Sequence, residues 1–304
     1  MSEQHPSSVS FESLHLHPTV MQGVRDAGFT LCTPIQAQTL PVALTGRDVA
    51  GQAQTGTGKT AAFLIAMYQS LLKHAPPSGR AKTSIRAVIL APTRELAVQI
   101  HRDSEVLGRH TGLRHVVVFG GTDYDKQRRQ LEDGVDVLIG TPGRLIDYFK
   151  QRVFDMRHAQ VVVLDEADRM FDLGFIADIR YVLRKLPPPD KRLSMLFSAT
   201  LSHRVLELAY EHMANPDLVR IEPDKVTVDS VRQLIYFPSM EEKIPLLIGL
   251  LRQSEARRTM VFVNTRRMAE RLENTLVAND LHAQALSGDV DRKSTRLNSS
   301  HPYR

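Results

Sequence analysis

Residues 53–60 read AQTGTGKT, between a short strand-like stretch at 48–51 and a segment of helical periodicity at 60–74 (TAAFLIAMYQSLLKH). Gly56 and Gly58 allow backbone conformations that bring main-chain N–H groups close to a ligand. At a helix N-terminus such groups bind anions. A strand, a glycine-rich loop ending in Lys-Thr, and a helix form the context of a phosphate-binding loop. This stretch therefore predicts an α/β fold that binds a nucleotide.

The residue types within the loop predict separate roles. Lys59 would reach the β- and γ-phosphates of a bound nucleotide, and the hydroxyl of Thr60 would bind Mg²⁺. The backbone around the phosphates would come from Ala53, Gln54, Thr55, Gly56, Thr57 and Gly58. Ala53 departs from the usual G-x-x-x-x-G-K-[ST] pattern, which begins with glycine. The alternative, a glycine-rich turn that happens to carry a lysine, is disfavoured by the strand before it and the helix after it.

A second motif follows an apolar run, because Val161–Leu164 (VVVL) leads directly into the acidic residues at 165–168 (DEAD). Ligands of open α/β folds bind at the carboxyl ends of the strands. Asp165 fits a Mg²⁺ site beside the loop hydroxyl, through water. Glu166 fits the group that orients or deprotonates an attacking water. An acidic tetrapeptide alone is usually a solvated turn, but its pairing with the phosphate-binding loop favours catalysis.

Short β-branched runs alternate with segments of helical periodicity along the first 220 residues. The expected strands are 87–91, 116–119, 135–140, 161–164 and 194–197, and the expected helices include 60–74, 94–110 and 202–214. Continuous apolar strands that alternate with helices favour a parallel sheet covered on both faces. The predicted fold class is therefore α/β, with a doubly wound parallel sheet.

The pattern changes at 221–233 (IEPDKVTVDSVRQ), which is polar and has no sustained period. We predict a first lobe at 1–220, a linker at 221–233 and a partial second lobe at 234–290. In the second lobe the expected strands are 234–237, 260–263 and 283–286, and the expected helices are 240–253 and 266–278. Residues 291–304 lack an apolar period and read as a non-native tail, with a disordered native tail as the alternative.

The composition is that of a soluble globular protein, with 42% hydrophobic and 24% charged residues. One cysteine, Cys32, can close no intramolecular disulfide, which favours a reducing compartment. No apolar run approaches the ~18 residues of a membrane span, and no secretory signal is visible, so we expect a cytoplasmic protein without a membrane partner. The net charge of +5 indicates little, because Arg292–Arg304 carry four basic and no acidic residues.

The ordered set of motifs resembles the DEAD-box ATP-dependent RNA helicases across roughly residues 11–290. In order, the motifs are Gly28-Phe29, Thr33–Gln36 (TPIQ), the loop at 53–60, Pro92–Leu96 (PTREL), Gly120-Gly121, Thr141–Arg144 (TPGR), DEAD at 165–168, Ser198–Thr200 (SAT) and Val261–Thr265 (VFVNT). Residues 120–148 and 164–180 are most similar to the RhlB type of bacterial helicase. The resemblance implies two RecA-like lobes, the second of them incomplete here.

The resemblance also implies roles for individual residues. Gln36 would recognise the adenine edge and Phe29 would pack on its ring, while Lys59, Asp165 and Glu166 would form the catalytic set. The backbone of RNA would be held by Pro92, Thr93, Arg94, Gly120, Gly121, Thr141, Pro142, Gly143, Arg144, Asn264 and Thr265. Contacts to the backbone carry no base information, so the expected binding is independent of sequence. Asp168, Ser198 and Thr200 would couple hydrolysis to strand separation.

The implied activity is an RNA-stimulated ATPase that separates short RNA duplexes in RNA turnover, with an endoribonuclease scaffold as a possible partner in an RNA degradosome. The 304 residues contain no ARGxD-like segment and no HRxGRxGR-like segment, which supplies arginine fingers in the family. Because such a finger contributes on the order of 10³–10⁵ in rate, we expect weak ATP binding and almost no turnover. The alternatives are a non-catalytic ATP- and RNA-binding module and a P-loop ATPase acting on DNA.

Overall fold

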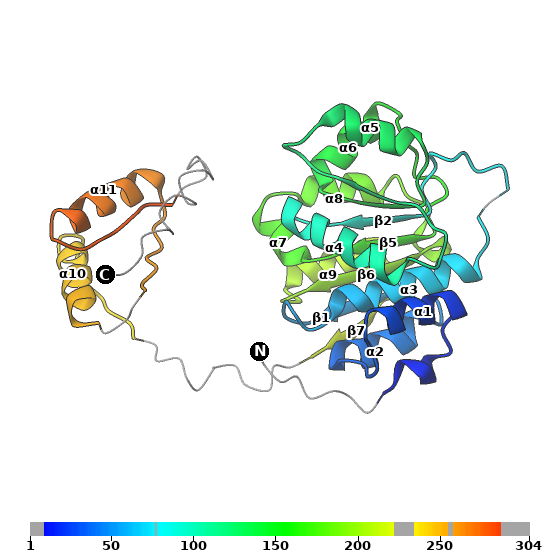
Figure 1. Ribbon diagram of the computed structural model, residues 1–304, viewed down its shortest axis with the longest axis horizontal. Coiled ribbons are helices and arrows are strands. Elements are labelled where there is room, and N and C mark those ends of the chain that lie inside the picture. The colour runs from blue at the N-terminus through cyan, green and yellow to red at the C-terminus, as the bar shows by residue number, and fades with distance from the viewer. Residues whose placement is uncertain (1–8, 77, 222–233, 255–257, 287–304) are drawn as a thin grey trace, which may run out of the picture. The chain divides into compact units, whose positions relative to one another are not determined.

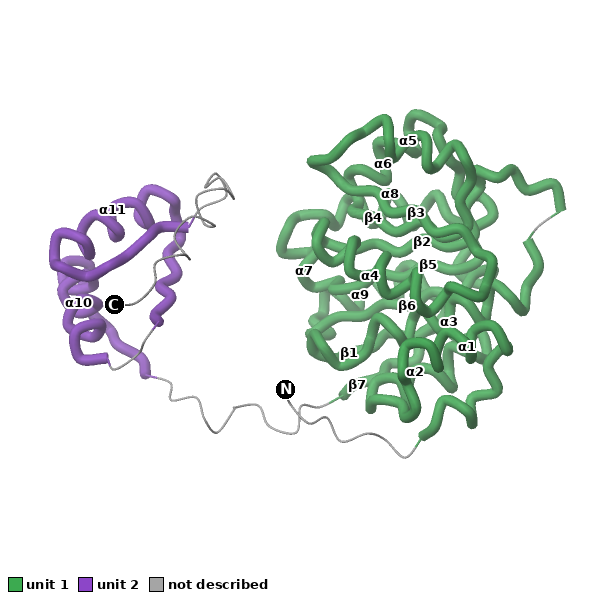
Figure 2. The backbone as a smooth tube through the Cα atoms, in the orientation of Figure 1, with its two compact units in different colours: residues 1–224 green, residues 225–304 purple. Residues whose placement is uncertain are grey.

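The computed structural model describes residues 9–76, 78–221, 234–254 and 258–286. The chain separates into two compact units, residues 1–224 and 225–304, and each is described by itself (Figure 2). Apart from Ile221, the predicted linker at 221–233 lies outside the described residues, as does the predicted tail at 291–304.

The first unit is built on one sheet of seven parallel strands, in the order β3-β4-β2-β5-β6-β1-β7 (Figure 1). The strands are β1 Val49–Gln52, β2 Ala87–Leu90, β3 His115–Val118, β4 Val137–Gly140, β5 Val161–Leu164, β6 Leu193–Ser198 and β7 Asp217–Arg220. The predicted parallel α/β sheet is therefore confirmed. Sequence reasoning missed β7, since this edge strand (DLVR) buries only Val219 and lacks an apolar run.

Helices cover both faces of the sheet (Figure 1). They are α1 Pro18–Asp26, α2 Pro34–Ala43, α3 Lys59–Lys73, α4 Arg94–Leu107, α5 Tyr124–Glu132, α6 Pro142–Lys150, α7 Ala167–Asp172, α8 Ile176–Leu183 and α9 His203–His212, with 3₁₀ turns at Phe11–Leu14 and Pro189–Lys191. Alternate strand residues enter two separate cores. Val161 and Val163 of β5 pack in the core shared with α1–α4, and Val162 and Leu164 pack in the core shared with α6–α9.

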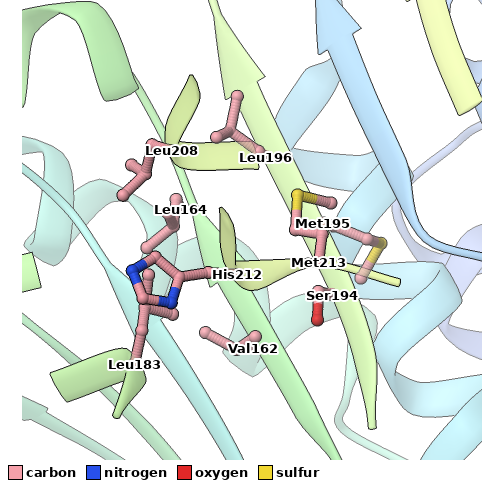
Figure 3. Close-up of a pocket in the computed structure, with 9 residues that line it drawn as sticks. All are labelled: Val162, Leu164, Leu183, Ser194, Met195, Leu196, Leu208, His212 and Met213. Carbon is pink, nitrogen blue, oxygen red and sulfur yellow. The ribbon is translucent and has the colours of Figure 1, made fainter. Parts of the chain in front are cut away.

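A small cavity of about 10 Å³ lies in the second core, between β5, β6, α8 and α9 (Figure 3). Its walls are mostly apolar, including Leu164, Leu183, Leu208 and Met213, with His212 as a polar neighbour. This volume is at the lower limit for one water molecule. The cavity is therefore a packing defect rather than a site for a nucleotide or a substrate.

The second unit contains α10 (Lys243–Gln253) and α11 (Arg266–Val277), and its described residues form no strand. The prediction of strands at 234–237, 260–263 and 283–286 is therefore wrong. A strand is stable only when its main chain pairs within a sheet that has an apolar face to bury. Here the side chains of Phe237 and Phe262 are 93% and 86% exposed. Of the helices in the described parts of both units, none is long and apolar enough to cross a membrane.

Candidate functional site

The carboxyl edge of the sheet brings together motifs that are far apart in the sequence. The glycine-rich loop follows β1, the acidic motif follows β5, and Ser198 ends β6, which lies between those two strands. The backbone N–H of Ala53 donates to the carbonyl of Ser198 at 3.0 Å, and the N–H of Asp165 donates to the carbonyl of Leu90 at 3.0 Å. Parallel pairing therefore sets the start of each motif at the same edge.

The loop has a backbone conformation that favours glycine at two positions. Gly56 and Gly58 have φ angles of +83° and +91°. A Cβ atom on Gly58 would lie 2.5 Å from Nε2 of Gln36, so a larger residue would collide there as well as being strained. Gly58 directly precedes α3, which places the free N–H groups of that helix at the loop. The geometry fits a phosphate-binding loop.

Lys59 and Asp165 form the charged centre of this edge. The Lys59 ammonium is buried, and its Nζ has no hydrogen-bond partner among the described residues. Asp165 is 2% exposed and accepts a hydrogen bond from the N–H of Glu166 at 2.9 Å. Burial raises the pKa of Asp165 to about 6, although the nearby Lys59 ammonium acts to lower it. A buried cation without a partner fits an anionic ligand.

A cavity of about 410 Å³ opens beside these residues, which is within the usual size of a ligand pocket. Phe29, Lys59, Thr60, Asp165 and Glu166 all line it, so the structure brings these predicted site residues together. Sequence reasoning missed the wall that α4 supplies, which consists of Leu96, Gln99, Asp103, Val106 and Leu107. The helical spacing of these residues was the available signal, but it does not distinguish a pocket wall from a core face.

Gln36 is buried and makes two internal hydrogen bonds. Its Oε1 accepts from the N–H of Thr33 at 2.8 Å, at the start of α2, and its Nε2 donates to the carbonyl of Gly58 at 3.0 Å. Phe29 is 37% exposed, and its ring stacks on Phe11 with centroids 6.1 Å apart. Phe11 was not singled out from the sequence, because its contact with Phe29 spans eighteen positions.

The segments that follow β2, β3 and β4 carry the arginines and glycines predicted to bind RNA, in loops and in the first turns of α4 and α6. These three strands are neighbours in the sheet. The Arg94 guanidinium lies over the Phe119 ring, 5.1 Å from its centroid. Gly121 has a φ of +77°, and a Cβ there would lie 3.8 Å from Nη1 of Arg94. The Arg144 guanidinium lies over the Tyr124 ring at 4.9 Å.

The remaining residues predicted to bind RNA occupy helix starts and turns. Thr93 caps α4, since its Oγ1 accepts from the N–H of Leu96 at 3.3 Å. Thr141, Pro142 and Gly143 form the start of α6, Pro92 precedes Thr93, and Gly120 precedes Gly121. Asn264 and Thr265 lie in the second unit, where Thr265 caps α11 by accepting from the N–H of Met268 at 3.2 Å. The predicted RNA-binding residues that the structure brings together are therefore those of the first unit.

The acidic motif contacts the Ser-Ala-Thr motif directly. The N–H of Asp168 donates to Oγ of Ser198 at 3.2 Å. The N–H and Oγ1 of Thr200 donate to Oδ2 of Asp168 at 3.0 and 3.2 Å. Glu166 has a left-handed backbone, with φ of +51°, and its carboxylate pairs with Arg169 at 3.4 Å. Hydrogen bonds therefore connect the two motifs to each other beside the cavity.

Known proteins resemble this chain in sequence and in structure. The sequence pattern of the family described as DEAD/DEAH box helicase matches residues 33–208. An ATP-dependent RNA helicase RhlB from Xanthomonas axonopodis pv. citri is 58% identical over 294 residues, which cover 96% of this chain and 52% of that protein. An ATP-dependent RNA helicase RhlB from Vibrio cholerae is 51% identical over 293 residues, covering 96% of this chain and 67% of that protein.

A solved structure agrees with these sequence matches. The crystal structure of a DEAD box protein from the hyperthermophile Methanococcus jannaschii superposes with a TM-score of 0.63 at 28% identity, covering 95% of this chain and 76% of the other. The chain spans about half the length of the Xanthomonas relative. The predicted resemblance, including its RhlB type, is confirmed.

Proposed function

The chain belongs to the DEAD/DEAH box helicase family, and on that premise we propose that its first unit binds ATP with Mg²⁺ and the backbone of RNA. It would serve as the nucleotide-binding part of an ATP-dependent RNA helicase, the activity named for its relatives. The observation that carries this proposal is the buried ammonium of Lys59, which has no hydrogen-bond partner within the described part of the chain. It lies near Asp165, at the N-terminus of a helix that follows a glycine-rich loop.

Lys59 and the N–H groups at the start of α3 would hold the β- and γ-phosphates. Thr60 and Asp165 would hold Mg²⁺, which neutralises charge on the phosphates when it is bound. The described residues contain no group of three or more His, Cys, Asp or Glu that could hold a metal. A hydroxyl and one carboxylate suit Mg²⁺, which keeps most of its ligands as water and phosphate oxygen.

Phe29 would pack on the adenine ring, because its side chain is partly exposed and lines the cavity. Gln36 would recognise the adenine edge with its amide, which already joins the loop through Gly58. Glu166 lines the same cavity and would orient the attacking water. Its contact with Arg169 fixes the carboxylate at the start of α7.

Arg94, Gly121 and Arg144 would bind phosphates along one RNA strand, because they follow three neighbouring strands of the sheet. Asp168, Ser198 and Thr200 would transmit changes at the acidic motif to the end of β6. We further propose that residues 234–290 begin a second RecA-like lobe, which would add Asn264 and Thr265 to the RNA contacts. An endoribonuclease scaffold as partner and a cytoplasmic location also belong to this proposal.

Binding tests the proposal without requiring turnover. We expect ATP, titrated calorimetrically into the 304-residue chain, to bind in excess Mg²⁺ and to lose most of its affinity in EDTA. Fluorescence anisotropy at low salt should show that single-stranded RNA binds in preference to DNA of the same sequence, because the 2′-hydroxyl distinguishes the two. Equal affinity for both would favour a P-loop ATPase acting on DNA, and no binding of ATP would contradict the proposal.

A further inference from the structure

The side chain of Arg144 lies against two tyrosine rings. Its guanidinium carbon is 4.9 Å from the centroid of Tyr124 and 5.6 Å from that of Tyr148. The two rings contact each other, with centroids 4.7 Å apart and planes inclined by 36°. Stacked in this way, a guanidinium uses its faces, while its N–H groups point outward along its edge. Arg144 also shares a side-chain hydrogen bond with the Tyr148 hydroxyl, so the aromatic pair restrains the guanidinium through both ring contact and this hydroxyl.

One N–H group at the edge of the guanidinium is not used in a hydrogen bond with any described residue. Nη1 of Arg144 is buried and has no hydrogen-bond partner among the described residues. Arg144 as a whole is only partly buried, so a ligand can reach the accessible part of its side chain while Nη1 stays enclosed. A phosphate oxygen is the acceptor that a guanidinium fork matches best.

The two rings are themselves held in place. Tyr148 is fully buried, and its hydroxyl donates to the main-chain carbonyl of Tyr124 at 2.7 Å. Nε2 of Gln151, which follows α6, donates to the hydroxyl of Tyr124. Tyr124 is the first residue of α5, and Tyr148 lies one turn after Arg144 on α6. The rings therefore connect the start of α5 to the last part of α6, and these two helices follow the neighbouring strands β3 and β4.

We propose that Tyr124 and Tyr148 are positioning residues for RNA binding, which hold the Arg144 guanidinium so that its free edge meets a backbone phosphate. This inference rests on the proposed function. The second arginine predicted to bind RNA has a parallel arrangement, since Arg94 lies 5.1 Å from the centroid of Phe119. Both arginines are thus ordered before the ligand arrives, which lowers the conformational entropy lost on binding.

The test compares Tyr124→Leu, which removes the ring, with Tyr124→Phe, which keeps it. We expect Tyr124→Leu to weaken binding of a single-stranded RNA about 3–10-fold, the usual size of a cation–π contribution, and Tyr124→Phe to stay within about twofold of the unchanged chain. Tyr181→Leu is the matched control, because the Tyr181 ring lies beside Lys150 and Lys185, 5.7 and 5.5 Å from its centroid, and neither lysine is predicted to bind RNA. It should leave RNA affinity unchanged.

A double-mutant cycle separates positioning from a general effect on folding. If Tyr124 acts through Arg144, then Tyr124→Leu should have no further effect on RNA affinity in an Arg144→Gln background. Affinity for ATP should be the same in all variants. Additive losses, or RNA binding by Tyr124→Leu at full strength, would overturn the inference while leaving the proposed function intact. Absence of RNA binding by the unchanged chain would instead contradict the proposed function.

Discussion

The side-chain amide of Gln36 donates a hydrogen bond to the main-chain carbonyl of Gly58 at 3.0 Å. The same amide accepts from the N–H of Thr33, so one side chain joins the start of α2 to the phosphate-binding loop. Because both bonds use a neutral amide that donates and accepts, no carboxylate or aliphatic side chain can replace it. The segment proposed to recognise the base is therefore joined by hydrogen bonds to the loop proposed to bind phosphate.

Replacing this amide tests the connection. Gln36→Glu removes the donor to Gly58 and brings a negative charge toward the triphosphate, so we expect ATP affinity to fall about 10-fold or more. Preference for ATP over GTP should also decrease, as measured by competition against a fluorescent ATP analogue. Gln253→Glu, an exposed change of the same type in the second unit, is the control and should bind ATP normally.

We expect Lys59 to contribute to ATP affinity but not to the stability of the fold. Lys59→Met keeps much of the side-chain volume but removes the buried ammonium, which has no partner among the described residues. We expect ATP affinity to fall about 100-fold, because charge-assisted hydrogen bonds to phosphate are lost. The melting temperature should not decrease at pH 5, where Asp165, with a pKa of about 6, is mostly protonated and makes no ion pair with Lys59. Lys73→Met, at the exposed far end of α3, should change neither quantity. A large loss of stability in Lys59→Met would contradict this assignment.

Asp165 predicts an unusual dependence of stability on pH. Its pKa is raised from 3.8 to about 6, so the folded state resists ionisation, and the stability from this group is complete below pH 3.8 and lost as pH rises through 6. Asp165→Asn should therefore raise the free energy of unfolding more at pH 7.5 than at pH 4.5, by roughly 2 kcal/mol between the two. Urea unfolding at both pH values measures the difference. An equal effect at the two pH values would show that Asp165 titrates normally.

The contact between the acidic and Ser-Ala-Thr motifs should stabilise the first unit. Asp168→Ala removes the acceptor for two hydrogen bonds from Thr200, at 3.0 and 3.2 Å. We expect the free energy of unfolding to fall by about 1–2 kcal/mol, with ATP affinity within twofold of the unchanged chain. Asp172→Ala, an exposed change on the same helix, should leave stability unchanged. Loss of ATP binding in Asp168→Ala would place this residue in the nucleotide site instead.

Much of the first unit was predictable from local patterns. The run at 161–164 is apolar at every position because β5 is buried on both faces of the sheet, and it forms a strand at those residues. The predicted helix at 94–110 ends instead at Leu107, directly before Gly108, so only its boundary was wrong. In the second unit the apolar runs at 234–237 and 260–263 have strand-like composition but do not form strands, because composition does not supply the neighbouring strand that pairing requires.

The sequence by itself determined which residues can wrap a phosphate, because the glycines at 56 and 58, the lysine and the following helix all lie in one continuous segment, residues 56–73. Only the tertiary structure determined which side chains from other parts of the sequence surround the predicted site residues. The α4 wall with Asp103, the stacking of Phe11 on Phe29 and the rings around Arg144 join residues distant in the chain. Periodicity reports whether a side chain is buried, but the partner that buries it depends on strand order, which no local pattern contains.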